Sequence, residues 1–212
     1  MSQLETRKTQ VSRRTLAKGA AWSVPVIATA AAAPAASASV VPGQSSVGPV
    51  SVSCSLTSPV PLTATWTLTL TATTPTSAAP GDALPAPTLT ATVTTDAQSG
   101  GLLRQLGVTS LDGTSTAPYT VSGAVVNPGD RTATLTVPTT TVDPAGTGGL
   151  TTTATGTGAA ETAGASAGSI LVTLKPFDIS LTAHGGAFDG STIAGTCTPP
   201  DGTVLSPVIQ VQ

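Results

Sequence analysis

The chain has 212 residues, of which 8 are basic and 10 acidic, so its formal net charge is −2 at neutral pH. Charged residues make up only 8% of the sequence and aromatic residues 2%, whereas 39% of the residues are hydrophobic. Disordered chains combine low hydrophobicity with high net charge, so this composition predicts a folded chain. From Ser39 onward there are three basic and nine acidic residues. That balance excludes a basic patch for nucleic acid and a polybasic site for a membrane surface.

The first 38 residues have the pattern of an export signal. The sequence SRRTLAK around Arg13 and Arg14 resembles a twin-arginine signal, and a mildly apolar, alanine-rich run follows over residues 19–34. An A-x-A cleavage pattern ends at Ala38. We expect the twin-arginine export machinery to carry the chain and signal peptidase to cut between Ala38 and Ser39. A permanent span needs ~20 strongly apolar residues, so the mature form is expected to be secreted or attached to the cell surface. An uncleaved anchor is the alternative.

The clearest strand pattern of the chain covers residues 62–73, with the sequence LTATWTLTLTAT. Apolar residues and threonines alternate with a period of two, which predicts a strand with one buried and one solvated face. Threonine suits the solvated face because its β-branched side chain favours extended backbone. Residues 50–57 alternate in the same way and predict a preceding strand. Residues 39–49 contain Pro, Gly and Ser and are predicted to form a flexible lead-in.

Weaker alternation, separated by turn residues, continues to the end of the chain. It predicts further strands over residues 88–94, 108–111, 119–126, 132–137, 150–155, 169–174, 177–183 and 191–197, with a short edge strand over 208–212. One helical stretch, residues 102–106, is preceded by two glycines and followed by Gly107. About nine or ten short strands with almost no helix predict an all-β fold. We expect a single domain over residues 50–212, built as an antiparallel two-sheet sandwich, with a signal-peptide helix before it.

Cys54 and Cys197 are the only cysteines. In an exported protein such a pair is expected to form a disulfide, which would join the first predicted strand to the last. Two buried free thiols are the alternative. Cys54 and Trp66 resemble the Cys and Trp pair of immunoglobulin domains, but those domains total only about 100 residues and close a much shorter loop. The expected sandwich is therefore immunoglobulin-like in architecture and not in family.

Several features occur together along the chain. They are the twin-arginine signal, the strand-borne Cys54, the motif LGVTSLDG at residues 106–113, the sequence TATG at residues 153–156, and the closing Cys197. Together they resemble a group of secreted proteins from high-GC Gram-positive bacteria that is classed as a domain of unknown function. The resemblance extends over residues 50–197. It implies neither an activity nor any catalytic residue.

One pattern points to nucleophilic catalysis. Residues 164–168 read GASAG and match the G-x-S-x-G motif with Ser166 as the nucleophile, and Asp178 and His184 follow in the order of a hydrolase triad. The chemistry needs a base for the serine proton and an acid to orient the base. The motif also needs a strand, a sharp turn and a helix, whereas a loop precedes Ser166 and a predicted strand follows it. We therefore predict no enzyme and no catalytic residues, with a serine hydrolase as the alternative.

Metal and cofactor sites are not expected either. His184 is the only histidine, and a transition-metal site usually needs three or four nitrogen or sulfur ligands. A weak Ca²⁺ site from Asp178, Asp189 or Asp201 is the alternative, although the Asp-Gly pairs at two of these positions are ordinary turn sequences.

The sequence therefore predicts an exported, non-catalytic β module of the cell envelope or the extracellular space, with a structural or adhesive role. The expected partners are the export machinery, signal peptidase and an envelope component. The threonine faces are expected to be solvated, with sugar binding or O-linked glycans as alternatives. A β protein that binds a small lipid or glycan is the remaining alternative function.

Overall fold

The computed structural model describes residues 41–212. The predicted signal-peptide helix, the export signal at Arg13 and Arg14 and the cleavage site between Ala38 and Ser39 lie outside the described residues. The strands are β1 (Val41–Ser58), β2 (Leu62–Ala78), β3 (Ala83–Leu84), β4 (Thr88–Thr94), β5 (Ser110–Gly123), β6 (Gly129–Thr141), β7 (Thr151–Thr157), β8 (Glu161–Thr162), β9 (Gly168–Leu174), β10 (Phe177–His184), β11 (Thr192–Thr198) and β12 (Ile209–Val211). The helices are α1 (Ala97–Gln105) and the 3₁₀ turn η1 (Gly186–Phe188).

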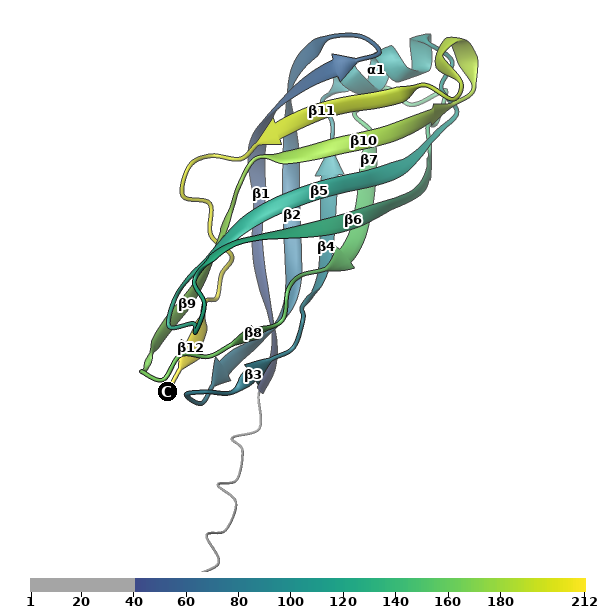
Figure 1. The fold of residues 1–212 in the computed structure, drawn as a ribbon. Coiled ribbons are helices and arrows are strands. Elements are labelled where there is room, and N and C mark those ends of the chain that lie inside the picture. Colours follow the sequence, from purple (N-terminus) through teal and green to yellow (C-terminus); the bar gives the residue numbers. More distant parts are fainter. Residues whose placement is uncertain (1–40) are drawn as a thin grey trace, which may run out of the picture. The chain divides into compact units, whose positions relative to one another are not determined.

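Eight strands form one closed ring. They pair in the order β1, β11, β10, β5, β6, β7, β4 and β2, and the pairing of β2 with β1 closes the ring (Figure 1). The all-β class is therefore confirmed, but the predicted two-sheet sandwich is wrong. A sandwich has two sheets with free edges, whereas β1 here pairs on both sides, with β11 and with β2. The two-residue strands β3 and β8 form a separate small sheet.

Strand β1 starts earlier than the sequence predicted. The supposedly flexible lead-in over residues 39–49 is wrong from residue 41 onward, because this segment pairs with the second half of β2. Ser45 stands opposite Ala72, is only 3% exposed, and bonds through Oγ to Thr74 Oγ1 at 2.7 Å. The Ser45 hydroxyl also donates to the carbonyl oxygen of Pro207 at 2.6 Å. Local polarity predicts flexibility, but the strand partner satisfies these polar groups.

An interruption between two consecutive strands divides the sheet at one end of the ring. Lys175 and Pro176 separate β9 from β10, as the sequence indicated, and β5 pairs with β10 along its first half and with β9 along its second half. Strand β12 lies between β9 and β2 and runs parallel to β2. It was predicted as an edge strand over 208–212, but it is an internal strand that joins the two sides of the ring.

Helix α1 lies at the other end of the ring, next to the turn between β10 and β11 (Figure 1). Its N-cap is Asp96, whose Oδ1 accepts a hydrogen bond from the backbone N–H of Ser99 at 2.7 Å. Gly107, with φ +73°, follows the helix, as predicted. The helix is longer than the predicted 102–106, because it includes Gly100. A Cβ at Gly100 would stand 2.5 Å from the carbonyl oxygen of Gly148, so close packing requires a glycine inside this helix.

Candidate ligand-binding cavity

The apolar faces of the strands point into the ring. Along β2, Ala64, Trp66, Leu68 and Ala72 are buried and alternate with threonines, which confirms the predicted parity. The same alternation on the other ring strands places apolar side chains on one inner surface, here called the lumen. Eight-stranded closed sheets either fill this space with side chains or hold one small ligand.

Small side chains leave part of the lumen empty. Ala117 on β5 stands directly opposite Ala133 on β6, and Ala91 on β4 stands opposite Ala154 on β7. All four alanines line a cavity of about 140 Å³. Larger residues, including Leu68, Leu135 and Ile179, form much of the remaining wall. Paired residues on adjacent strands lie side by side on one face of the sheet, so each alanine pair leaves space in front of its part of the lumen wall.

The cavity wall offers almost only apolar contacts. Ser115 lines the cavity, but its hydroxyl donates to the carbonyl oxygen of Asp178 at 2.9 Å. Thr74 also lines it, and its hydroxyl is bonded to Ser45. Within residues 41–212 no buried side-chain nitrogen or oxygen lacks a hydrogen-bond partner. An occupant of the lumen thus meets hydrocarbon and satisfied polar groups, which suits an apolar molecule.

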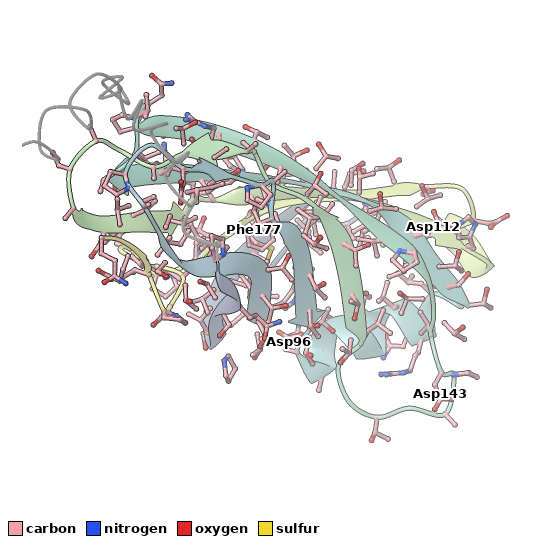
Figure 2. All side chains as sticks on the ribbon, turned by 90° about the horizontal axis from the view of Figure 1, so that it is seen from below. Asp96, Asp112, Asp143 and Phe177 are labelled. Atoms are coloured by element: carbon pink, nitrogen blue, oxygen red, sulfur yellow. A yellow bond between two sulfur atoms is a disulfide. The ribbon has the colours of Figure 1, made fainter. Side chains whose placement is uncertain are left out.

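Helix α1 covers the end of the ring near Trp66. The indole Nε1–H of Trp66 donates to Ser99 Oγ of α1 at 3.2 Å. Figure 2 shows all described side chains, with Asp96 beside the start of the helix. A second cavity of about 70 Å³ lies here, and its wall includes Leu102 and Leu103 of α1. Trp66 lines both cavities, so it reports on occupancy at either side.

Among the neighbouring strands of the ring, β6 and β7 have the fewest paired residues. These strands pair only where Leu135 and Thr136 of β6 meet Thr155 and Gly156 of β7. Within residues 41–212 no backbone hydrogen bond joins residues 129–134 of β6 to residues 158–162. We call this unpaired stretch between the two segments the window.

Side chains close the window. Arg131 donates from Nε to Glu161 Oε1 at 2.7 Å and from Nη2 to Glu161 Oε2 at 3.0 Å. The hydroxyl of Tyr119 accepts a hydrogen bond from the backbone N–H of Ala159 at 2.8 Å. Glu161, Tyr119 and Ala159 all line the 140 Å³ cavity, so the window leads into the lumen. The hydrogen bond to Glu161 is the largest cause that raises the pKa of Arg131, which keeps the guanidinium charged.

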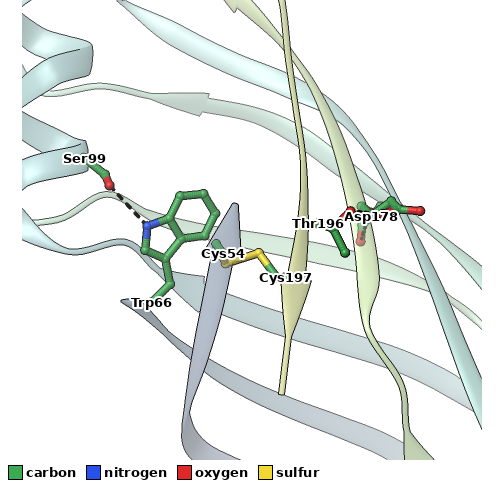
Figure 3. The surroundings of a disulfide bond; sticks show 7 residues. Cys54, Trp66, Ser99, Asp178, Thr196 and Cys197 are labelled. Atoms are coloured by element: carbon green, nitrogen blue, oxygen red, sulfur yellow. Dashed lines mark hydrogen bonds between the residues drawn. A yellow bond between two sulfur atoms is a disulfide. The ribbon is translucent and has the colours of Figure 1, made fainter. Parts of the chain in front are cut away.

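The disulfide Cys54–Cys197 is present, as predicted. The two cysteines are directly paired between β1 and β11, with their Cα atoms 4.0 Å apart, and both are fully buried. They pack in one core cluster with Trp66 (Figure 3). The bond therefore fastens one seam of the ring, where a strand near the start of the domain meets one near its end. Such bonds persist in oxidising compartments.

The residues of the alternative hydrolase triad do not come together. Asp178 and His184 lie six residues apart on the single strand β10, which separates them by roughly 20 Å. His184 Nε2 instead contacts Asp112 Oδ2 at 2.8 Å. Ser166 is an exposed loop residue just before β9. Strand β9 pairs with the second half of β5, whereas His184 pairs with Ser110, the first residue of β5. Ser166 and His184 therefore lie toward opposite ends of β5. The G-x-S-x-G motif is thus a sequence match without the triad geometry.

The alternative calcium residues are also separated in the structure. Asp178 lies on β10, with its Oδ1 accepting a hydrogen bond from Thr196. Asp189 follows η1 and accepts from the backbone N–H of Gly185, and Asp201 lies in the turn before β12. Within the described part of the chain no group of three or more His, Cys, Asp or Glu residues is placed to hold a metal ion.

Sequence reasoning missed the residues of the cavity and its window. Alternation places every second residue of a strand on one face, but it does not show that Ala91 stands beside Ala154 or Ala117 beside Ala133. Arg131 and Glu161 lie 30 residues apart, and each belongs to a segment that reads as ordinary strand or loop. The sequence did contain one signal for Arg131: basic residues are rare after Ser39, and Arg131 is one of only three.

Comparisons with known proteins identify the family. The family of unknown function DUF6801 matches residues 51–206, so the chain belongs to this family. Comparison with curated proteins and with solved structures found no match. Among the residues that the structure describes, no helix is long and apolar enough to span a membrane.

Proposed function

We propose that this protein is an exported, non-catalytic β protein that binds one small apolar ligand inside its closed sheet. Family membership assigns no activity, so the proposal depends on the lumen. The observation that carries it is the 140 Å³ cavity, whose wall is almost entirely apolar. A soluble protein normally fills its interior to crystal-like density, and a void of this size forfeits packing energy unless a ligand occupies it.

The volume sets the size of the ligand. An engineered apolar cavity of about 150 Å³ stays dry and takes up benzene or xenon. The lumen cavity is close to that volume, so it fits a benzene-sized group or a short aliphatic chain. Burying such a group removes apolar surface from water and is favourable by about 25 cal/mol per Å².

Two observations support export. The chain begins with a pattern that resembles a twin-arginine signal, and its only two cysteines form a disulfide. Changing Arg13 and Arg14 to Lys should trap the precursor inside the cell, as seen by immunoblot of cell and medium fractions. Unimpaired secretion of the double variant would refute the assignment.

Fluorescence of Trp66 provides the test of lumen binding. Replacing Trp22 by Phe leaves Trp66 as the only tryptophan, and Trp66 lines the cavity. Titration with benzene should shift the Trp66 emission and raise the melting temperature, with a negative heat-capacity change in calorimetry. The matched control is Ala133→Leu, whose larger side chain fills the void and should abolish both effects. Equal responses from the two proteins would contradict binding in the lumen.

An adhesive role is the second candidate, and the outer face of the ring favours it. Strands β2, β4 and β7 present threonines in register: Thr94 pairs with both Thr67 and Thr151, and Thr92 pairs with Thr69 and Thr153. This outer surface carries hydroxyl and methyl groups without charge. A pull-down from cell-envelope fractions tests the role. Replacing Thr92 and Thr153 by Glu should abolish capture, and undiminished capture would argue against this face.

A further inference from the structure

We propose that the ligand of the lumen is a small monocarboxylic acid, and that Arg131 binds its carboxylate at the window in place of Glu161. The inference rests on the proposed function and adds the chemical class of the ligand. Its apolar tail occupies the 140 Å³ cavity, and its charged group stays at the edge of the lumen.

Arg131 is held in place independently of Glu161. Its Nη1 donates to the carbonyl oxygen of Asp130 at 3.0 Å, and its Nη2 donates to that of Asn127 at 2.6 Å. Its side chain is 23% exposed, so the guanidinium is largely shielded from water. Backbone contacts therefore position the cation whether or not Glu161 is bound to it.

Glu161 shows which chemical group fits there. Both of its carboxylate oxygens meet Arg131, at 2.7 and 3.0 Å, which is the two-point geometry that arginine and carboxylate prefer. Glu161 belongs to the two-residue strand β8, which pairs with β3. Its side chain is 13% exposed, and among the described residues its carboxylate accepts hydrogen bonds from Arg131 alone, whereas Arg131 also has two backbone partners. A ligand carboxylate that takes its position keeps both hydrogen bonds of Arg131 and leaves Glu161 free to move into water.

The charges at the window favour an acidic ligand over a basic one. A cationic ligand at Glu161 would have to displace Arg131, which two backbone carbonyls also hold. Of the other two basic residues after Ser39, Arg104 donates from Nε to the carbonyl oxygen of Asp143, whereas Lys175 lines the cavity and pairs with the exposed Asp130 at 2.7 Å. Arg131 is the cation bonded to the carboxylate of the cavity wall, and Lys175 adds a second positive charge there. An alcohol of the same length would fill the cavity but would leave the arginine with its own carboxylate.

Hexanoate, hexan-1-ol and hexylamine test the inference, since each has six carbons. The apolar tail of hexanoate is one methylene shorter, which works against the preference expected for it. Binding is measured by Trp66 fluorescence in the Trp22→Phe chain and by calorimetry. We expect hexanoate to bind more tightly than hexan-1-ol, and hexylamine to bind most weakly. Glu161→Gln should tighten hexanoate by about tenfold, equivalent to about 1.4 kcal/mol, because the competing carboxylate is gone. The affinity for hexan-1-ol should not change.

Arginine variants and a nearby ion pair complete the test. Arg131→Gln should abolish the preference for hexanoate over hexan-1-ol. Arg131→Lys should retain part of it, since lysine keeps the positive charge but cannot form the two parallel hydrogen bonds of a guanidinium. Lys175→Gln is the matched control, because it removes the other cation that lines the cavity and leaves the guanidinium contacts of Arg131 in place. It should leave the preference for hexanoate intact.

The outcomes separate the two proposals. If hexanoate and hexan-1-ol bind equally, or if Glu161→Gln leaves the hexanoate affinity unchanged, the carboxylate assignment is overturned while lumen binding stands. The Glu161→Gln result decides the matter even if Arg131→Gln fails to fold. If none of the three compounds and no benzene binds, the proposed function itself fails.

Discussion

Filling the cavity should stabilise the protein. Ala133 is 1% exposed, lines the lumen and stands opposite another alanine. Ala133→Leu adds three carbons, and each buried methylene contributes about 0.8 kcal/mol, so the free energy of unfolding should rise by about 2 kcal/mol. For a domain of this size that corresponds to roughly 4–8 °C in melting temperature. Urea unfolding at equilibrium gives the free energy, and thermal melts give the second measure.

A second alanine provides the control for this prediction. Ala163 is fully buried but lines neither cavity, and it packs with Val125 and Ile170. Ala163→Leu must therefore push tightly packed neighbours apart, which costs about 1–3 kcal/mol. The two substitutions are chemically identical, so opposite changes in the free energy of unfolding would show that Ala133, and not Ala163, lines the void. If Ala133→Leu destabilises the protein as much as Ala163→Leu does, the lumen is already packed and the argument for a ligand collapses.

Three further predictions concern the disulfide, an ion pair and the alternative triad. Replacing Cys54 and Cys197 by Ser should lower the free energy of unfolding by about 2–5 kcal/mol, measured by urea unfolding, and a thiol titration of the unreduced parent should find no free thiol. Asp130→Asn should destabilise the protein only at higher pH. The hydrogen bond from Lys175 is the largest cause that lowers the pKa of Asp130 below 3.8. The stability gained from ionised Asp130 is therefore present above pH 3.8 and is lost as the pH falls through the lowered pKa. Urea unfolding across this pH range should show the difference vanish in acid. Any esterase or peptidase turnover found in substrate panels should persist in Ser166→Ala, and its loss would revive the hydrolase.

The sequence by itself determined the position of most strands and the buried face of the clearest one, but it missed β3 and β8 and divided β5 into two strands. Alternation over residues 62–73 assigns each side chain of the strand to one face, because the backbone geometry of a strand has a period of two. It also placed the break at Pro176, since proline lacks the N–H that a strand ladder needs. The pairing of Cys54 with Cys197 followed from their number and from the expected compartment. These features depend on local backbone chemistry or on simple counting.

Only the tertiary structure decided how the strands associate. Whether an alternating strand belongs to a sandwich or to a closed ring depends on what pairs with its second edge, and the side-chain pattern of the strand is the same in both cases. Strand β1 pairs with β2 along one edge and with β11 along the other. The pairing with β2 also places residues 41–47 in the strand. The cavity depends on register in the same way, because the register of β5 and β6 brings two short side chains, Ala117 and Ala133, side by side on the lumen wall. The ion pair of Arg131 with Glu161 forms across the window, where no backbone pairing connects the two segments. Contacts of this kind join residues far apart in the chain, so the fold creates them and local sequence does not encode them.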